Sequence, residues 1–273
     1  MPTQTDTPID RREGATRRAA LVRKGLVKVP EITVYFWVIK VLTTGMGEAT
    51  SDFLVHRLPP PVAVLIGAAV LAVAMWWQLR ATRYRAVTYW FAVVMVAVFG
   101  TMAADALHIG LHVPYIVSTA LFAVTLVVIF VAWQRTEGTV SIHSIFTPRR
   151  ELFYWSAVMA TFALGTAAGD MTARTLNLGY LDSGVMFAVL ITVPLVGWRR
   201  LRLDPIVAFW FAYVVTRPLG ASFADWMGVP HALGGLDWGR GDVSIGLTIP
   251  IVALVGYLAW SRVDVQADEM TAG

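Results

Sequence analysis

The chain has 273 residues, of which 57% are apolar and only 15% are charged, and its mean hydropathy is +0.63. These values exclude an ordinary soluble globular protein. Because there is no cysteine, disulfides and thiolate metal sites are excluded too.

The first thirty residues are polar and basic, without the apolar core of a cleavable signal peptide. We expect residues 1–30 to form a basic cytoplasmic tail. The tail either is disordered or forms a short basic helix on the membrane surface over residues 16–29. No nucleic acid partner is expected, because a membrane explains this charge better.

Eight apolar segments follow, most of them near the ~20 residues that a helix needs to cross a bilayer. They lie at about 32–54, 62–79, 86–108, 114–134, 152–174, 184–200, 205–226 and 244–261. The pattern predicts an all-α polytopic membrane protein. Its single transmembrane domain spans residues 31–262 within the lipid bilayer and precedes a cytoplasmic C-terminal tail, residues 263–273.

Basic residues predict the orientation of these spans. Of the 22 Lys and Arg, 17 lie in the N-terminal tail or in every second connection. The positive-inside rule therefore places both termini in the cytoplasm, with the spans in a bacterial inner membrane. Each returning span ends in a tryptophan that we expect at the membrane interface: Trp77, Trp133, Trp198 and Trp260.

A short signature occurs four times, in which a tryptophan precedes a glycine by ten residues and an aspartate by fifteen. The copies are Trp37/Gly47/Asp52, Trp90/Gly100/Asp105, Trp155/Gly165/Asp170 and Trp210/Gly220/Asp225. Each copy predicts one helical hairpin, with repeats at about 31–80, 84–135, 150–200 and 204–262 and a common orientation. The sequence leaves open whether the hairpins surround one axis or pair as two halves.

Two segments carry a resemblance to a known family: FWVIKVLTTGMGEATSD, from Phe36 to Asp52, and TFALGTAAGD, from Thr161 to Asp170. The chain resembles a bacterial multi-spanning "membrane-anchored protein" family with four tandem two-helix repeats, each with a characteristic tryptophan. The resemblance covers about residues 30–262 and implies the four-hairpin fold. It implies no activity, since that family has no assigned function.

The four aspartates are the first candidate site. They are predicted near the outer edge of the hydrocarbon and near helix carboxyl ends, where burial and the helix dipole both oppose an anion. One explanation is structural: the aspartates bond local backbone, and the glycines allow close helix contact. The other is a cluster of carboxylates that holds a cation or relays protons: Asp52, Asp105, Asp170 and Asp225.

Further ionisable residues occur in single copies of the repeat. Lys40, Thr44, Glu48 and Asp52 are spaced four apart and share a helix face, and Arg217 occupies the position of Thr44 in the fourth copy. We expect these residues to belong to a substrate or ion pathway. The alternative is mutual neutralisation, for example of Arg217 by Glu48.

Two histidines extend the hypothesis to a divalent metal. His56 and His108 follow their aspartates by four and three residues, and imidazole with carboxylate suits such ions, although no tight ligand motif is present. The connection at residues 226–243 is expected to be an irregular loop or, alternatively, a lid.

We therefore expect a small membrane protein that transports or conducts a cation, either protons or a divalent metal. The alternative is a non-transporting sensor or assembly module whose repeated residues are structural. A membrane-embedded enzyme using Glu48, Asp52 and His56 is a third hypothesis, and enzyme activity is the less expected outcome. The substrate, its direction and the oligomeric state stay open.

Overall fold

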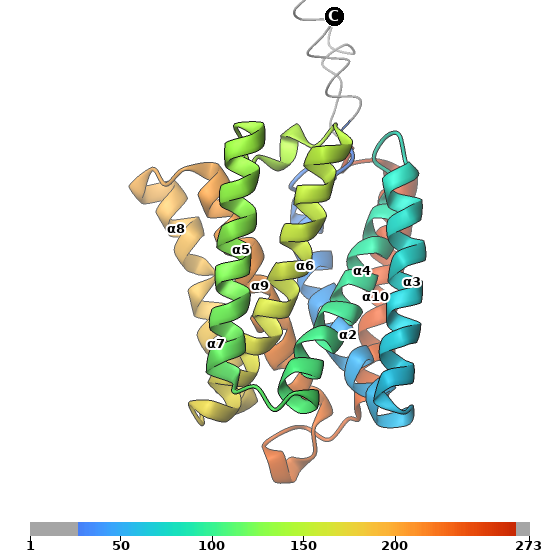
Figure 1. The fold of residues 1–273 in the computed structure, drawn as a ribbon, viewed down its shortest axis with the longest axis vertical. Helices are drawn as coiled ribbons and strands as arrows, with labels where there is room; N and C mark the ends of the chain where they lie inside the picture. The colour runs from blue at the N-terminus through green and yellow to red at the C-terminus, as the bar shows by residue number, and fades with distance from the viewer. Residues whose placement is uncertain (1–26, 266–273) are drawn as a thin grey trace, which may run out of the picture.

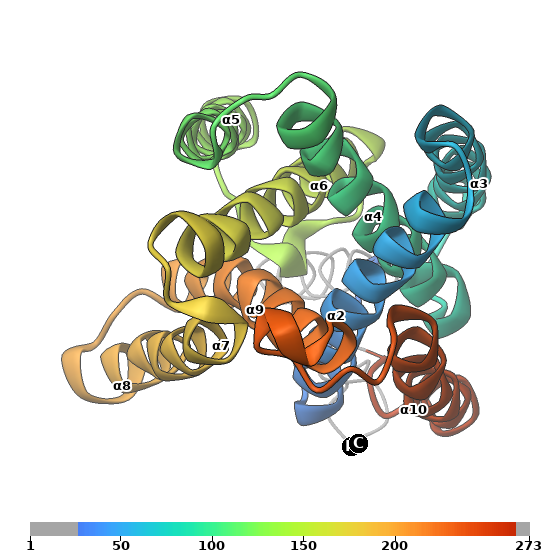
Figure 2. The ribbon, with the colours of Figure 1, turned by 90° about the horizontal axis from the view of Figure 1, so that it is seen from below.

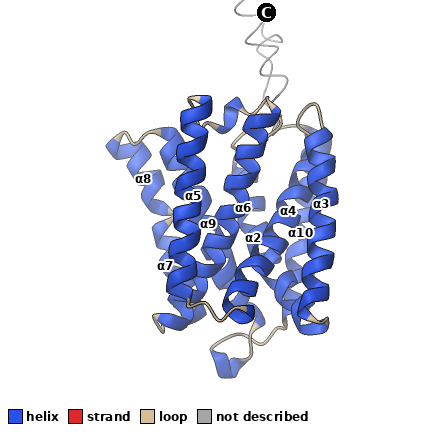
Figure 3. Cartoon of the chain, in the orientation of Figure 1, coloured by secondary structure: helices blue, strands red, loops and turns tan. Residues whose placement is uncertain are grey.

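The structure is a computed structural model that describes residues 27–265, apart from the side chains of Ile109 and Leu201. Every regular element in this range is helical (Figure 3). The predicted surface helix at 16–29 and most of both tails lie outside the described residues.

The helices follow one another as four hairpins (Figure 1). The first hairpin is α2 (Val34–Arg57) and α3 (Pro60–Arg80), and the second is α4 (Ala86–Asp105) and α5 (Tyr115–Glu137). The third pairs α6 (Pro148–Asp170) with α7 (Gly179–Leu190) and α8 (Thr192–Leu201), and the fourth pairs α9 (Pro205–Gly228) with α10 (Arg240–Ser261). The other regular elements of the described residues are short segments of π- or 3₁₀-helix: η1 (Ala106–Gly110), η2 (Ile142–Ser144), η3 (Met171–Thr175) and η4 (His231–Leu233).

Seven helical segments are long and apolar enough to cross a membrane. The remaining helix, α2, has 24 residues but carries Lys40, Glu48 and Asp52. The sixth predicted segment, 184–200, needs correction, because the helical span begins earlier and covers Gly179–Arg200. The helix is interrupted at Ile191, between α7 and α8. The cause is Pro194, which lacks the N–H that would bond the carbonyl of Leu190, four residues before it.

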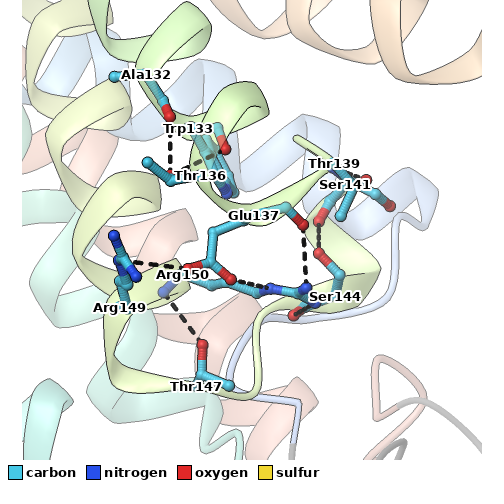
Figure 4. A network of polar contacts seen from close by, with 10 residues as sticks. All are labelled: Ala132, Trp133, Thr136, Glu137, Thr139, Ser141, Ser144, Thr147, Arg149 and Arg150. Atoms are coloured by element: carbon cyan, nitrogen blue, oxygen red, sulfur yellow. Dashed lines mark hydrogen bonds and ion pairs between the residues drawn. The ribbon is translucent and has the colours of Figure 1, made fainter.

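The connection between the second and third repeats is held by a polar network at residues 132–150 (Figure 4). Thr147 caps α6 by accepting from the backbone N–H of Arg150, and Pro148 occupies the first helical turn. Arg150 Nε pairs with Glu137 at 2.9 Å, while its Nη1 donates to the Ser144 carbonyl at 3.1 Å. The network fixes where α6 begins.

The four hairpins surround one axis. The first helix of each hairpin lies inside, and α2, α4, α6 and α9 pack on one another in a closed ring (Figure 2). The second helix of each hairpin packs mainly on the first helix of the next copy: α3 on α4, α5 on α6, α7 on α9 and α10 on α2. Of the two arrangements left open by the sequence, the structure has the single ring.

Aromatic side chains close the ring in the half where the inner helices begin. In each copy the aromatic residue before the signature tryptophan contacts the tryptophan of the next copy, and the fourth copy returns to the first. The ring centroids lie 5.7, 5.6, 6.2 and 5.7 Å apart for Phe36–Trp90, Tyr89–Trp155, Tyr154–Trp210 and Phe209–Trp37.

The signature glycines form a second closed ring. Each of these glycines faces the residue that lies seven places after the tryptophan of the next copy. A Cβ added to the glycine would stand only 2.5, 2.8, 2.5 or 2.9 Å from the Cβ of that residue, in chain order of the copies. The pairs are Gly47–Ala97, Gly100–Phe162, Gly165–Arg217 and Gly220–Thr44. Any side chain here would push the inner helices apart, so the glycines serve close helix contact.

One expectation about the terminal tryptophans is wrong. Trp77, Trp198 and Trp260 are 43%, 49% and 83% exposed, so an interfacial position stays a prediction for these three. Trp133 is 0% exposed, because it stacks on Phe153 and packs edge-on against Trp210.

The two ends of the bundle differ, and we name them by their residues. The basic end is where the inner helices begin, and the carboxylate end is where Asp52, Asp105, Asp170 and Asp225 lie. The segment before α2 covers the basic end: Lys28 pairs with the buried Glu151 at 2.6 Å, and Glu31 N–H donates to the Asp264 carbonyl at 2.8 Å.

Candidate functional site

The four signature aspartates line one cavity of about 530 Å³ at the carboxylate end, which we call the vestibule. Each comes from a different inner helix, since Asp105 and Asp170 end α4 and α6 and the other two lie in the last turns of α2 and α9. Glu48 also lines it. The other lining residues are Val55, His56, Tyr115, Ala173, Arg174, Gly179, Tyr180, Leu233 and Arg240.

Two of the four aspartates have arginine partners. Arg240 Nε lies 2.7 Å from Asp52 Oδ2, and Arg174 Nε lies 3.2 Å from Asp170 Oδ1. The side-chain carboxylates of Asp105 and Asp225 have no ion pair or hydrogen bond within residues 27–265. With five carboxylates against two arginines in its lining, the vestibule attracts positive charge.

Below the vestibule, Arg217 is 0% exposed and joins all four repeats. Its Nη2 donates to Glu48 Oε2 at 2.7 Å, to Thr166 Oγ1 at 2.6 Å and to Thr101 Oγ1, and its Nη1 donates to the Thr44 carbonyl at 2.8 Å. A buried guanidinium is tolerated only when it is paired and hydrogen-bonded in this way. We call these residues the arginine knot: Arg217, Glu48, Thr44, Thr101 and Thr166.

The arginine knot has a regular register. Glu48, Thr101 and Thr166 each lie eleven residues after the tryptophan of their copy, and the fourth such position is Ala221. The Glu48–Arg217 pair corresponds to the neutralisation alternative raised by the sequence. The Thr44 hydroxyl takes no part in the vestibule, because it donates to the Thr216 carbonyl at 3.1 Å.

Lys40 lies apart from Glu48, on the far side of Arg217 from the vestibule. It is 1% exposed, and its Nζ sits 3.9 Å from the ring centre of Phe162 and 4.0 Å from that of Tyr213. No hydrogen bond to this ammonium occurs within the described part of the chain. The two aromatic faces are its immediate surroundings.

The two candidate metal ligands do not come together. His56 lines the vestibule, and its Nδ1 lies 2.6 Å from the Asp52 carbonyl. His108 is buried outside the vestibule, 4.3 Å from the ring of Tyr115 and hydrogen-bonded to Ser118. Among residues 27–265, no three His, Asp or Glu side chains are grouped to hold a metal ion.

Sequence reasoning missed part of the vestibule. Arg174 donates to the hydroxyls of Tyr180 at 3.0 Å and Tyr115 at 3.2 Å, beside Asp170. Both tyrosines open a returning helix, and only this position in the hairpin could have indicated them. The segment 226–243 contributes Leu233 and Arg240 to the lining, and its two ends belong to α9 and α10. Between them it folds back on itself, since Leu236 N–H donates to the Trp226 carbonyl at 2.8 Å.

Comparison with known proteins identifies the repeats. One family model, described as Repeat of Unknown Function (DUF347), matches residues 35–84, 88–139, 153–203 and 208–264. No curated protein and no solved structure matches the chain. The match confirms a tandem array of four repeats.

Proposed function

The chain belongs to this repeat family of unknown function, and we propose that it is an integral membrane protein that binds a cation in the vestibule and moves it across the bilayer. One observation carries the proposal. Aspartates from four separate helices line one cavity, and the carboxylates of two of them, Asp105 and Asp225, have no ion pair or hydrogen bond among the described residues. Uncompensated carboxylates within an apolar bundle are costly unless a cation uses them.

The direction follows from the charge distribution. Arg80, Arg83, Arg85, Arg149, Arg150, Arg199, Arg200, Arg202 and Arg262 gather at or near the basic end. The positive-inside rule then supports a cytoplasmic basic end and a vestibule that opens outward. A cation would enter from outside and meet the arginine knot about halfway along the axis.

A second function is favoured by the arginine knot itself. Its charges satisfy one another, and the signature glycines serve close helix contact. A non-transporting membrane module would need both features and would not need Asp105 and Asp225. These two residues therefore separate the two functions.

The test is cation uptake by the purified protein in liposomes. A pH-sensitive dye or a Mn²⁺-quenched dye is trapped inside, and an inward gradient is imposed. We expect one of the two cations to enter, and Asp225→Asn to slow its entry about tenfold, equivalent to ~1.4 kcal/mol. Asp182→Asn is the matched control, because Asp182 is an exposed carboxylate in the first turn of α7 outside the vestibule lining. If neither cation enters faster than in protein-free liposomes, the transport proposal is wrong, and the non-transporting membrane module is the function that remains.

A further inference from the structure

Two positive side chains lie between the vestibule and the basic end. Arg217 is locked in the arginine knot, and Lys40 lies beyond it, with both cationic groups against the ring of Phe162, 5.3 and 3.9 Å from its centre. A second positive charge close to either would be strongly repelled, because water does not screen charges within the buried bundle. A metal ion would meet this repulsion twice. A proton avoids this repulsion, because it can be transferred from one side chain to the next and no ion has to move past Arg217 and Lys40.

Ionisable groups continue along the axis from Lys40 towards the basic end. The Lys40 ammonium lies over the ring of Tyr213. The buried Tyr213 hydroxyl has no hydrogen-bond partner among the described residues and interacts electrostatically with Tyr154. Tyr154 and Tyr89 share a hydrogen bond between their hydroxyls. All three tyrosines are at most 1% exposed.

The column ends on a carboxylate at the basic end. The ring of Tyr84 lies 5.7 Å from that of Tyr89, and the Tyr84 hydroxyl donates to Asp264 Oδ2. Asp264 is 1% exposed, and its Oδ1 is buried without a partner within residues 27–265. Burial raises the pKa of the Asp264 carboxyl, while donation from Tyr84 opposes that rise. The Asp264 carboxylate can therefore accept the proton that the column delivers, at the oxygen that has no partner among these residues.

Packing does not explain the hydroxyls of Tyr89 and Tyr154. Both residues occupy the position before the signature tryptophan, where the other two copies have Phe36 and Phe209. Phenylalanine makes the same contact with the next tryptophan at a similar distance, so the ring alone suffices for the closed aromatic ring. The two hydroxyls form a hydrogen bond that the symmetry of the repeat does not require.

We propose that the cation is the proton, and that Lys40, Tyr213, Tyr154, Tyr89 and Tyr84 form an axial relay that carries it from Glu48 to Asp264. This inference rests on the proposed function and names its substrate. Glu48 is suited to be the entry group, because it both lines the vestibule and belongs to the arginine knot.

The proton is conserved at every step. The Lys40 ammonium donates a proton to the Tyr213 oxygen as the Tyr213 hydroxyl proton moves to Tyr154. The same exchange continues through Tyr89 and Tyr84 to the Asp264 carboxylate, which releases the proton to water at the basic end. The neutral amine left at Lys40 then takes the proton that Glu48 has accepted from the vestibule, through a transient water that passes the Phe162 ring. Rotation of each hydroxyl then resets the relay.

Tyr154→Phe and Tyr89→Phe test the relay, because each keeps the ring and removes one hydroxyl. The matched control is Tyr257→Phe, which makes the same change on the exposed face of α10. In liposomes with a trapped pH dye and a potential set by potassium and valinomycin, we expect each relay variant to slow proton entry at least tenfold and the control to leave it unchanged. Lys40→Met, checked for monodispersity, should stop proton entry.

The outcomes separate the relay from the proposed function. The relay is overturned if all three relay variants conduct protons like wild type while Asp225→Asn conducts slowly, and the vestibule proposal then stands. It is also overturned if wild type admits Mn²⁺ and no protons. If wild type admits neither cation, both proposals fall.

Discussion

Gly165 and Arg217 are so close that a Cβ on Gly165 would stand 2.5 Å from the Cβ of Arg217. The glycine of the third copy therefore determines where the guanidinium of the fourth copy enters the arginine knot. The same glycine contact occurs between all four pairs of neighbouring inner helices, but only in this pair is the residue facing the glycine ionisable.

Gly165→Ala should consequently destabilise the protein. Overpacking of this kind costs about 1–3 kcal/mol, which exceeds the gain of up to ~1 kcal/mol that alanine gives over glycine within a helix. Thermal unfolding in detergent measures the change. Gly246→Ala in α10 is the matched control and should be neutral or stabilising, because an added Cβ there would meet no other part of the described residues within 4 Å beyond its own helical turn. Equal melting temperatures for both variants would contradict the close-contact explanation.

Glu48→Gln should be among the most damaging conservative changes in the chain. It leaves the buried Arg217 without a counter-charge, and breaking one side of a buried pair costs about 3–5 kcal/mol. Glu31→Gln, which removes an exposed carboxylate 3.7 Å from His143, should cost less than ~1 kcal/mol. Adding Arg217→Met to Glu48→Gln should restore part of the lost stability. A double variant no more stable than Glu48→Gln alone would show that the pair is not coupled.

Arg174→Gln should strengthen cation binding in the vestibule. The arginine now neutralises Asp170 and donates to Tyr115 and Tyr180, and its side chain is 50% exposed. Removing a half-exposed partner changes the interaction by about 1 kcal/mol, or roughly fivefold in the dissociation constant. A titration with the transported cation in detergent measures the effect. Weaker binding in this variant would mean that Arg174 helps to hold the cation.

Asp264 should give the protein a stability that falls as pH rises. Because burial raises its pKa above the value near 4 of an unfolded chain, the folded protein holds this proton where the unfolded chain has lost it. The contribution is therefore fully present below pH ~4 and is lost as pH rises through the folded pKa. Asp264→Asn should remove this part of the slope when melting temperature is followed against pH. Identical slopes for the variant and wild type would contradict the assignment.

The absence of native cysteine makes the orientation directly testable. In intact bacterial cells, an impermeant maleimide should label His231→Cys, which lies in the exposed loop at the carboxylate end. Thr82→Cys, in the connection between α3 and α4, should be labelled only after the membrane is opened. The reverse pattern would invert the proposed direction.

The sequence predicted more of the fold than of the site. The spans and the signature were readable because hydrophobic segments of fixed length and a fixed spacing survive in all four copies. The interruption at Ile191 was missed, although Pro194 was a visible signal for it. Trp133 was mistaken for an interfacial residue, since the sequence does not show that α5 packs against the next repeat.

Which residues come together in the site could not be predicted from the sequence alone. The shared helix face of Lys40 and Glu48 was correctly read, but the insertion of Arg217 between them depends on which copy lies next to the first in the ring. Periodicity gives no order around an axis. Tyr115 and Tyr180 were missed for the same reason, because they reach the vestibule from returning helices that carry no signature.

We propose that the unpaired carboxylates of the vestibule pass a cation across the membrane. The most direct test is the initial rate of proton entry into liposomes that contain the Asp105→Asn/Asp225→Asn double variant, compared with wild type. We expect a rate at least tenfold lower, with a melting temperature no lower than that of wild type. A double variant that admits protons as fast as wild type would contradict it.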